Sequence, residues 1–210
     1  MTQVIRIDRE GEQAAREELE ACILAGGVAI FPADGLYGLA ADPASPAAIR
    51  RIHKLKGRPA GKASAVMYFD PLAMRELIGA LGPRSAEAVA ALLPGPVTLV
   101  IANPEERYPL ACGDDPRKLG VRLIEGSLAG TRCPVFQTSA NLSGGPPPAE
   151  FGEVGLSLVR SVDLAIDGGK LTGEPSTVVD ISRLDEDGSW EVLRTGALPR
   201  DRVAAALDGG

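Results

Sequence analysis

The sequence predicts an α/β fold, a single domain built on a twisted, open, mixed sheet that is covered by helices. Segments with helical apolar spacing alternate along the 210 residues with short apolar runs typical of buried strands, and this alternation indicates an α/β sheet. A hairpin pattern near the C-terminus indicates that the sheet is mixed. No Ser/Gly-rich linker and no internal repeat divides the chain, so one domain over residues 1–210 is expected.

Helix signals occur in both halves of the chain. Apolar spacing predicts a helix at 11–25, which ends at Gly26 and Gly27. Ser45 before Pro46, and Asp70 before Pro71, are N-cap signals that begin two more helices. Further helices are predicted at about 127–131, 149–160 and 199–207.

Strand signals are short runs of mainly apolar residues. They predict strands at 28–31, 63–69, 97–101, 119–123, 135–137, 162–166, 177–181 and 191–194. The last two strands are joined by an acidic turn at 185–188, which predicts the C-terminal hairpin.

Composition excludes several classes of protein. Hydrophobic residues make up 45% and charged residues 24% of the chain, which is typical of globular proteins rather than disordered ones. The apolar stretch at 88–102 is too short and too interrupted by prolines to span a membrane. The N-terminus lacks a signal-peptide core. Three scattered cysteines are typical of a reducing cytoplasm. Their spacing and the single histidine argue against a metal site.

Cations gather in one segment of this acidic chain, whose net charge is −6. Residues 50–62 carry six Lys and Arg residues together with His53 and no acidic residue. Lys56, Arg58 and Lys62 lie where the segment becomes a Gly/Pro-punctuated loop, and such side chains can converge on phosphate oxygens. The glycine spacing does not fit a P-loop, and Ala63 stands where that motif needs Ser or Thr. A solvated helix face is the alternative interpretation.

A second candidate site is the polar loop at 138–144, which follows the predicted strand at 135–137. Polar loops at the carboxyl ends of strands commonly bind ligands in α/β sheets. A turn that satisfies its own backbone is the alternative. Ser139 is not expected to be a nucleophile, because no nucleophile-elbow motif surrounds it. Arg122 and Arg194 also end strands, and with the basic loop they suit a ligand with several negative charges.

Seven short motifs lie between about residues 15 and 205. In chain order they are Phe31-Pro32-x-Asp34-x-x-Tyr37-Gly38-Leu39, Lys56-x-Arg58-Pro59, Pro94-Gly95-Pro96-Val97-Thr98, Gly120-Val121-Arg122, Ser139-Ala140-Asn141-Leu142-Ser143-Gly144, Pro175-Ser176-Thr177-Val178-Val179-Asp180 and Leu193-Arg194-x-Gly196. Together they resemble the YrdC-like family, which includes the threonylcarbamoyl-AMP synthases. The resemblance implies a YrdC-like fold with a positively lined concave face. It also implies an enzyme that joins L-threonine, bicarbonate and ATP, with Mg²⁺, into threonylcarbamoyl-AMP and releases pyrophosphate. A tRNA threonylcarbamoyl-transferase would act downstream.

The resemblance also implies roles for individual residues. By position, the nucleotide would contact Lys56, Arg58, Lys62, Lys118, Asn141 and Arg194. Threonine would contact Gly35, Met67, Arg122, Ser139 and Ser176, and the reaction itself would take place beside Lys56, Arg58, Ser139 and Asn141. Arg122 suits the carboxylate of the amino acid.

This chain departs from the family pattern at two positions. The family has Thr where Gly35 stands and often His where Met67 stands. Both changes fall on the amino-acid side, so we expect the threonine pocket to be weaker, reshaped or suited to a different amine.

Two other functions remain open at this point. One is a divergent paralogue that makes another carbamoyl-AMP-type adduct. The other is a non-catalytic module that binds tRNA or double-stranded RNA, although the net charge and an aromatic content of 4% argue against it.

Overall fold

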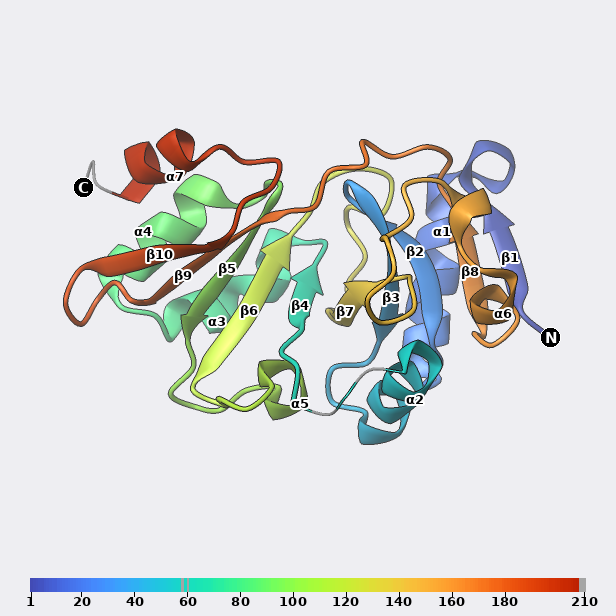
Figure 1. Ribbon diagram of the computed structural model, residues 1–210, viewed down its shortest axis with the longest axis horizontal. Coiled ribbons are helices and arrows are strands. Elements are labelled where there is room, and N and C mark those ends of the chain that lie inside the picture. Colours follow the sequence, from blue (N-terminus) through green and yellow to red (C-terminus); the bar gives the residue numbers. More distant parts are fainter. Residues whose placement is uncertain (58, 60, 208–210) are drawn as a thin grey trace.

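The computed structural model describes residues 1–57, 59 and 61–207. These residues form one ten-stranded mixed sheet in the order β1-β8-β2-β3-β7-β4-β6-β5-β9-β10 (Figure 1). The strands are β1 (Gln3–Arg6), β2 (Ala29–Ala33), β3 (Leu36–Ala41), β4 (Ala65–Tyr68), β5 (Val97–Ala102), β6 (Lys118–Leu123), β7 (Val135–Ser139), β8 (Leu164–Asp167), β9 (Thr177–Arg183) and β10 (Ser189–Arg194). The predicted α/β class with a mixed open sheet is confirmed, whereas the exact bounds of the domain stay a prediction.

The helices connect these strands and pack on the sheet. They are α1 (Ile7–Leu24), α2 (Pro46–Lys56), α3 (Arg75–Gly79), α4 (Pro83–Leu92), α5 (Pro109–Cys112), α6 (Leu156–Val159) and α7 (Arg200–Leu207), with short 3₁₀ turns η1 (Pro71–Met74) and η2 (Phe151–Glu153). None of the helices in the described ranges is both long enough and apolar enough to cross a lipid bilayer.

Two apolar clusters lie on opposite faces of the sheet. Helices α2, α4, α6 and α7 pack into the larger cluster, on the face that carries Leu99 and Phe136. Helix α1 packs into the second cluster, on the face that carries Phe31 and Val135. Because successive side chains of a strand point to opposite faces, β7 contributes Val135 to one cluster and Phe136 to the other.

The two predicted N-caps are confirmed. The Ser45 hydroxyl accepts a hydrogen bond from the Ala48 N–H at 3.3 Å and begins α2, which ends where Gly57 adopts a left-handed conformation with φ of 58°. The Asp70 carboxylate accepts from the Leu72 N–H at 2.9 Å and begins η1. Since an N-cap satisfies donors that have no partner within the helix, both signals could be recognised locally.

Every predicted strand overlaps an observed one, and β9 and β10 pair antiparallel as the predicted hairpin. The sequence analysis missed β1, β3, α4 and α5. The signal for β3 was the Asp34-Gly35 dipeptide, which joins β2 to β3 in an antiparallel hairpin. A two-residue Asp-Gly loop is typical of tight hairpins, and Asp34 has the positive φ, 74°, that such turns use.

Three helix predictions need correction. The segment at 127–131 is a set of turns; Gly126 just before it and Gly130 within it both have positive φ. The helix predicted at 149–160 is divided into η2 and α6, because Val154 and Gly155 are extended. The first helix begins at Ile7 rather than at residue 11 and contains a break at Gly11, whereas α7 agrees with its prediction.

One long connection joins the two ends of the sheet. Residues 168–176, here called the strap, leave β8 and cross over to β9, as the orange segment at the top of Figure 1 shows. The buried Tyr37 anchors the start of the strap, because its hydroxyl donates to the Gly169 carbonyl at 2.7 Å and accepts from the Gly168 N–H at 3.0 Å. The end of the strap lies beside the cavity that is described below.

Candidate active site

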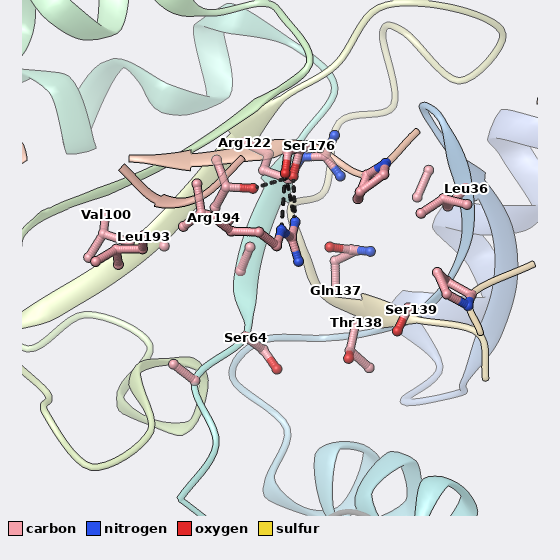
Figure 2. A pocket seen from close by; sticks show the side chains of 18 of the residues that line it. Leu36, Ser64, Val100, Arg122, Gln137, Thr138, Ser139, Ser176, Leu193 and Arg194 are labelled. Carbon is pink, nitrogen blue, oxygen red and sulfur yellow. Dashed lines mark hydrogen bonds between the residues drawn. The ribbon is translucent and has the colours of Figure 1, made fainter. Parts of the chain in front are cut away.

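A cavity of about 680 Å³ opens on the sheet face next to α1. Its volume is within the range of small-molecule sites. Its floor consists of side chains from β4, β5, β6, β7 and β9, and the strap forms one wall. Figure 2 shows these side chains converging on a common space.

The strand register arranges the floor in rows. Arg122 of β6 lies beside Met67 of β4. One row further, Gly120 pairs with Ala65, and Ala65 pairs with Gln137 of β7. Ser139 follows two residues later on the same face of β7. Gln137 therefore lies in the row between those of Arg122 and Ser139.

Arg122 is a buried cation with an unused donor. Its side chain is 6% exposed, and its Nη2 donates to the Asp34 carboxylate at 3.0 Å. Its buried Nε has no hydrogen-bond partner among the described residues. Burial lowers the pKa of the Arg122 guanidinium to about 10; Asp34 opposes this shift and Arg194 adds to it. A buried donor without a partner is costly, so an anionic ligand would satisfy a need that the protein leaves open.

A cluster of two hydroxyl groups and a second guanidinium comes from β5, the end of the strap and β10. The Thr98 and Ser176 hydroxyls are 2.9 Å apart and hydrogen-bonded. Arg194 donates to the Ser176 carbonyl and hydroxyl, at 2.8 and 3.1 Å from its Nη2 (Figure 2). Burial lowers the pKa of Arg194 as well. Arg194 therefore fixes the end of the strap while its guanidinium borders the cavity.

Lys118 reaches the cavity from the start of β6 and pairs with Asp180 of β9 at 2.8 Å. Burial opposes ionisation of Asp180, but hydrogen bonds from Lys118 and Ser182 hold the pKa of this carboxyl below its usual value. Asp180 is thus ionised at neutral pH and forms an ion pair with Lys118 at the β9 side of the cavity.

A smaller cavity of about 210 Å³ adjoins the first. It is lined by Lys56, Lys62, Ser139, Asn141, Ser143 and Gly144. Ser139, the last residue of β7, lines both cavities, so the two cavities meet at this residue. The structure thus gathers around Ser139 residues that are far apart in the sequence.

Lys56 holds this loop together. It is 4% exposed, and its ammonium group donates to the Ser139 carbonyl, to the Asn141 carbonyl at 2.7 Å and to Asn141 Oδ1 at 3.3 Å. The Asn141 amide in turn donates to the Gly145 carbonyl at 2.5 Å. An ammonium group has three hydrogens, and three acceptors of the loop surround this one. Lys56 therefore shapes the loop, whereas Lys62 is exposed at the rim.

The two positions that depart from the family pattern lie in different surroundings. Gly35 lines the larger cavity, and its carbonyl accepts from the Gly173 N–H of the strap at 2.9 Å. A Cβ atom at Gly35 would lie 2.1 Å from the Glu174 carbonyl oxygen, so the strap fills the place of any side chain there. Met67 is fully buried in the second apolar cluster and lies outside the lining of both cavities.

The remaining predicted site residues fall into two groups. Arg122, Ser139, Ser176, Lys118 and Arg194 line the larger cavity together, and Lys56, Lys62 and Asn141 line the smaller one. Arg58 lies outside the described residues. Within the described part of the chain, no group of three or more His, Cys, Asp or Glu side chains is arranged to hold a metal ion.

The sequence analysis gave no role to Gln137, Thr98, Glu174 or Asp180, which also line the larger cavity. The signal for Gln137 was its position two residues before Ser139, since alternate residues of a strand share one face. The positions of Thr98 and Glu174 depend on pairing between distant strands and on the path of the strap, which no local pattern specifies.

The Sua5/YciO/YrdC family model, described as telomere recombination, matches residues 21–196. The chain belongs to this family. The family resemblance predicted from the seven motifs is thereby confirmed.

Two relatives in the family carry the name threonylcarbamoyl-AMP synthase. The protein from Thiobacillus denitrificans is 32% identical over 181 residues, which is 82% of this chain and 94% of the relative. The protein from Pyrococcus abyssi is 28% identical over 99% of this chain. This chain spans only 61% of the length of that archaeal relative.

Solved structures of the family have the same fold. Sua5 of P. abyssi, in a crystal structure with L-threonine, matches 99% of this chain and 61% of its own with a TM-score of 0.83 at 28% identity. YciO of Escherichia coli matches 97% of this chain and all of its own with a TM-score of 0.81. At 22% identity, YciO is evidence for the fold alone.

Proposed function

We propose that this chain is a threonylcarbamoyl-AMP synthase, which joins L-threonine, bicarbonate and ATP and releases pyrophosphate. The observation that carries the proposal is the pair of adjoining cavities. Arg122 in the larger cavity suits a carboxylate, Lys62 in the smaller one suits phosphates, and Ser139 lines both. The name of the T. denitrificans relative, of which this chain covers 94%, supports the same activity.

The amino acid binds with its carboxylate on Arg122. A guanidinium forms strong, charge-assisted hydrogen bonds with carboxylates, and Arg122 retains a buried Nε donor for this purpose. The Thr98 hydroxyl of β5 and the Ser176 hydroxyl at the end of the strap keep their positions through their mutual hydrogen bond. The L-threonine in the P. abyssi crystal structure supports an amino-acid ligand in this fold.

The nucleotide occupies the other part of the site. Lys62 provides positive charge at the small cavity, and Lys118 and Arg194 provide it in the large one. Lys56 contributes by holding the Ser139–Asn141 loop in shape. Mg²⁺ would arrive with ATP, coordinated mainly by phosphate oxygens and water.

The chemistry requires no protein nucleophile. The threonine amine and bicarbonate condense to a carbamate with loss of water. A carbamate oxygen then attacks the α-phosphorus, forming an O–P bond as the bond to pyrophosphate breaks. The protein contributes proximity and stabilisation of negative charge, for which Arg122, Arg194 and Lys62 are suited. The product would supply a tRNA threonylcarbamoyl-transferase, and the cysteine pattern favours a cytoplasmic reaction.

An assay of pyrophosphate release tests the proposal. The purified protein is incubated with Mg²⁺, ATP, bicarbonate and each amino acid in turn, and the adduct is identified by mass spectrometry. Release that requires both threonine and bicarbonate supports the synthase. Release with another amine instead identifies the divergent paralogue. No release, together with salt-sensitive tRNA binding, identifies the RNA-binding module, because phosphate contacts weaken as salt increases.

A further inference from the structure

Gln137 stands in the middle of the cavity floor. It belongs to β7, pairs with Ala65 on one side and with Ala40 of β3 on the other, and lines the larger cavity. In the view of Figure 2 its carboxamide lies between the side chains of Arg194 and Ser139. It is therefore the polar group of the row between the proposed carboxylate site and the proposed phosphate site.

The residues around Gln137 leave space for its carboxamide. Its two register partners are alanines, and a Cβ atom at Gly38 would lie 3.0 Å from Gln137 Nε2. The absence of a side chain at Gly38 thus provides the space in which the amide lies.

The Gln137 carboxamide makes no side-chain hydrogen bond with any residue in the described ranges, as the absence of dashed lines at Gln137 in Figure 2 illustrates. An amide offers two donor hydrogens and a carbonyl acceptor. Hydrogen-bonding groups that are removed from water need partners, and a ligand that fills the cavity would shield this amide from water. The bound ligand must then supply the partner.

Position 35 cannot supply a contact to the amino-acid side chain, since the Glu174 carbonyl occupies the place that a Cβ atom would need. Met67 is buried outside the cavity lining. The positions from which relatives would reach the amino acid are therefore unavailable here, and Gln137 faces the same space from the floor.

We propose that Gln137 determines the specificity for the amino acid by hydrogen-bonding the side-chain hydroxyl of threonine. This inference rests on the proposed function. With the carboxylate on Arg122 and the carbamate next to Ser139, the Cα atom and its side chain lie over the middle row. A hydroxyl both donates and accepts a hydrogen bond, as a carboxamide does. The neutral amide also adds no charge beside the amine that must react.

The test compares threonine with valine, which has nearly the same shape but a methyl group in place of the hydroxyl. In Gln137→Met we expect kcat/KM for threonine to fall about tenfold, the effect of one lost hydrogen bond. We expect kcat/KM for valine and KM for ATP to be unchanged. Gln137→Ala should show the same selective loss, so that the result does not depend on how methionine packs. Gln13→Met, at an exposed glutamine of α1, is the matched control and should change neither rate.

An equal loss for threonine and valine would overturn the proposal. The carboxamide would then contact the carbamate or support the sheet beneath the cavity, and not bind the threonine hydroxyl. Unchanged rates for both amino acids would overturn it as well. Calorimetric titration of threonine and valine separates this inference from the proposed function. If wild-type protein binds threonine without releasing pyrophosphate, the synthase assignment fails, and the inference survives only if Gln137→Met weakens threonine binding selectively. If wild-type protein does not bind threonine, both proposals fail.

Discussion

The two adjoining cavities are each lined by one buried cation, and the two cations differ in their hydrogen-bond partners. Arg122 donates to Asp34 and retains an Nε donor that no described residue accepts. Lys56 is just as deeply buried, but its ammonium group lies among acceptors of the Ser139–Asn141 loop. Both residues belong to family motifs. The comparison teaches that a buried cation in a motif can either keep a donor open or direct its donors to the backbone around the cavity.

The largest effect is expected for Arg122→Ala. The variant should lower kcat/KM for threonine about 100-fold, because a charge-assisted hydrogen bond to a carboxylate contributes up to about 3 kcal/mol. ATP affinity should change little. Steady-state pyrophosphate kinetics and nucleotide titration measure the two quantities. Arg122→Lys is the control that keeps the charge and loses the planar fork, and unchanged threonine kinetics in both variants would remove Arg122 from the site.

Lys56→Met tests the other half of the comparison. Losing its three hydrogen bonds to the loop should lower the free energy of unfolding by about 3 kcal/mol, because each bond contributes about 1 kcal/mol. Urea unfolding measures this loss. Lys62→Met, at the exposed rim, is the matched control and should raise KM for ATP without changing stability. If Lys56→Met weakened ATP binding at full stability, its assignment to the loop would be wrong.

Gly35→Thr restores the residue that the family pattern has at this position. Because its Cβ would lie 2.1 Å from the Glu174 carbonyl oxygen, we expect a loss of about 1–3 kcal/mol of stability, the usual cost of overpacking. Thermal unfolding measures it. Gly152→Ala, where nothing lies within 4 Å of the added atom, should be nearly neutral. A Gly35→Thr protein of full stability and improved threonine affinity would mean that the strap moves readily.

Asp180→Asn should have the smallest effect, a modest loss of stability at neutral pH that disappears in acid. The pKa of Asp180 is lowered in the folded protein, so its contribution to stability is present above the unfolded pKa of about 3.9. This contribution is lost as the pH falls through the lower, folded value. The variant should therefore lose less stability than wild type as the pH falls below about 4. Urea unfolding across this range measures the difference, and parallel curves would show that the ion pair with Lys118 contributes nothing.

The sequence predicted those parts of the fold that depend on local signals. Ser45 and Asp70 cap helices through contacts within three residues, and the strand at 119–123 is a short, largely apolar run. The sequence did not predict β3, whose strand character follows from pairing with β2 and β7 on both sides.

The site could be predicted only in part, for the same reason. Motif positions brought Arg122, Ser176 and Arg194 together correctly as lining residues. They could not reveal that Lys56 would be engaged by the loop, or that the strap would fill the space above Gly35. Those facts depend on where segments more than 80 residues apart come to lie. The role of each motif residue in binding stays a prediction.

The rows of the cavity floor carry a consequence for insertions and deletions. Arg122 and Gln137 project from strands that are hydrogen-bonded on both sides. Loss of a single residue early in β7 would rotate every later side chain of that strand to the opposite face. It would bring the bulk of Phe136 toward the substrates and send the Gln137 amide into an apolar layer. Evolution can therefore exchange side chains at this site far more easily than it can change the number of residues beneath it.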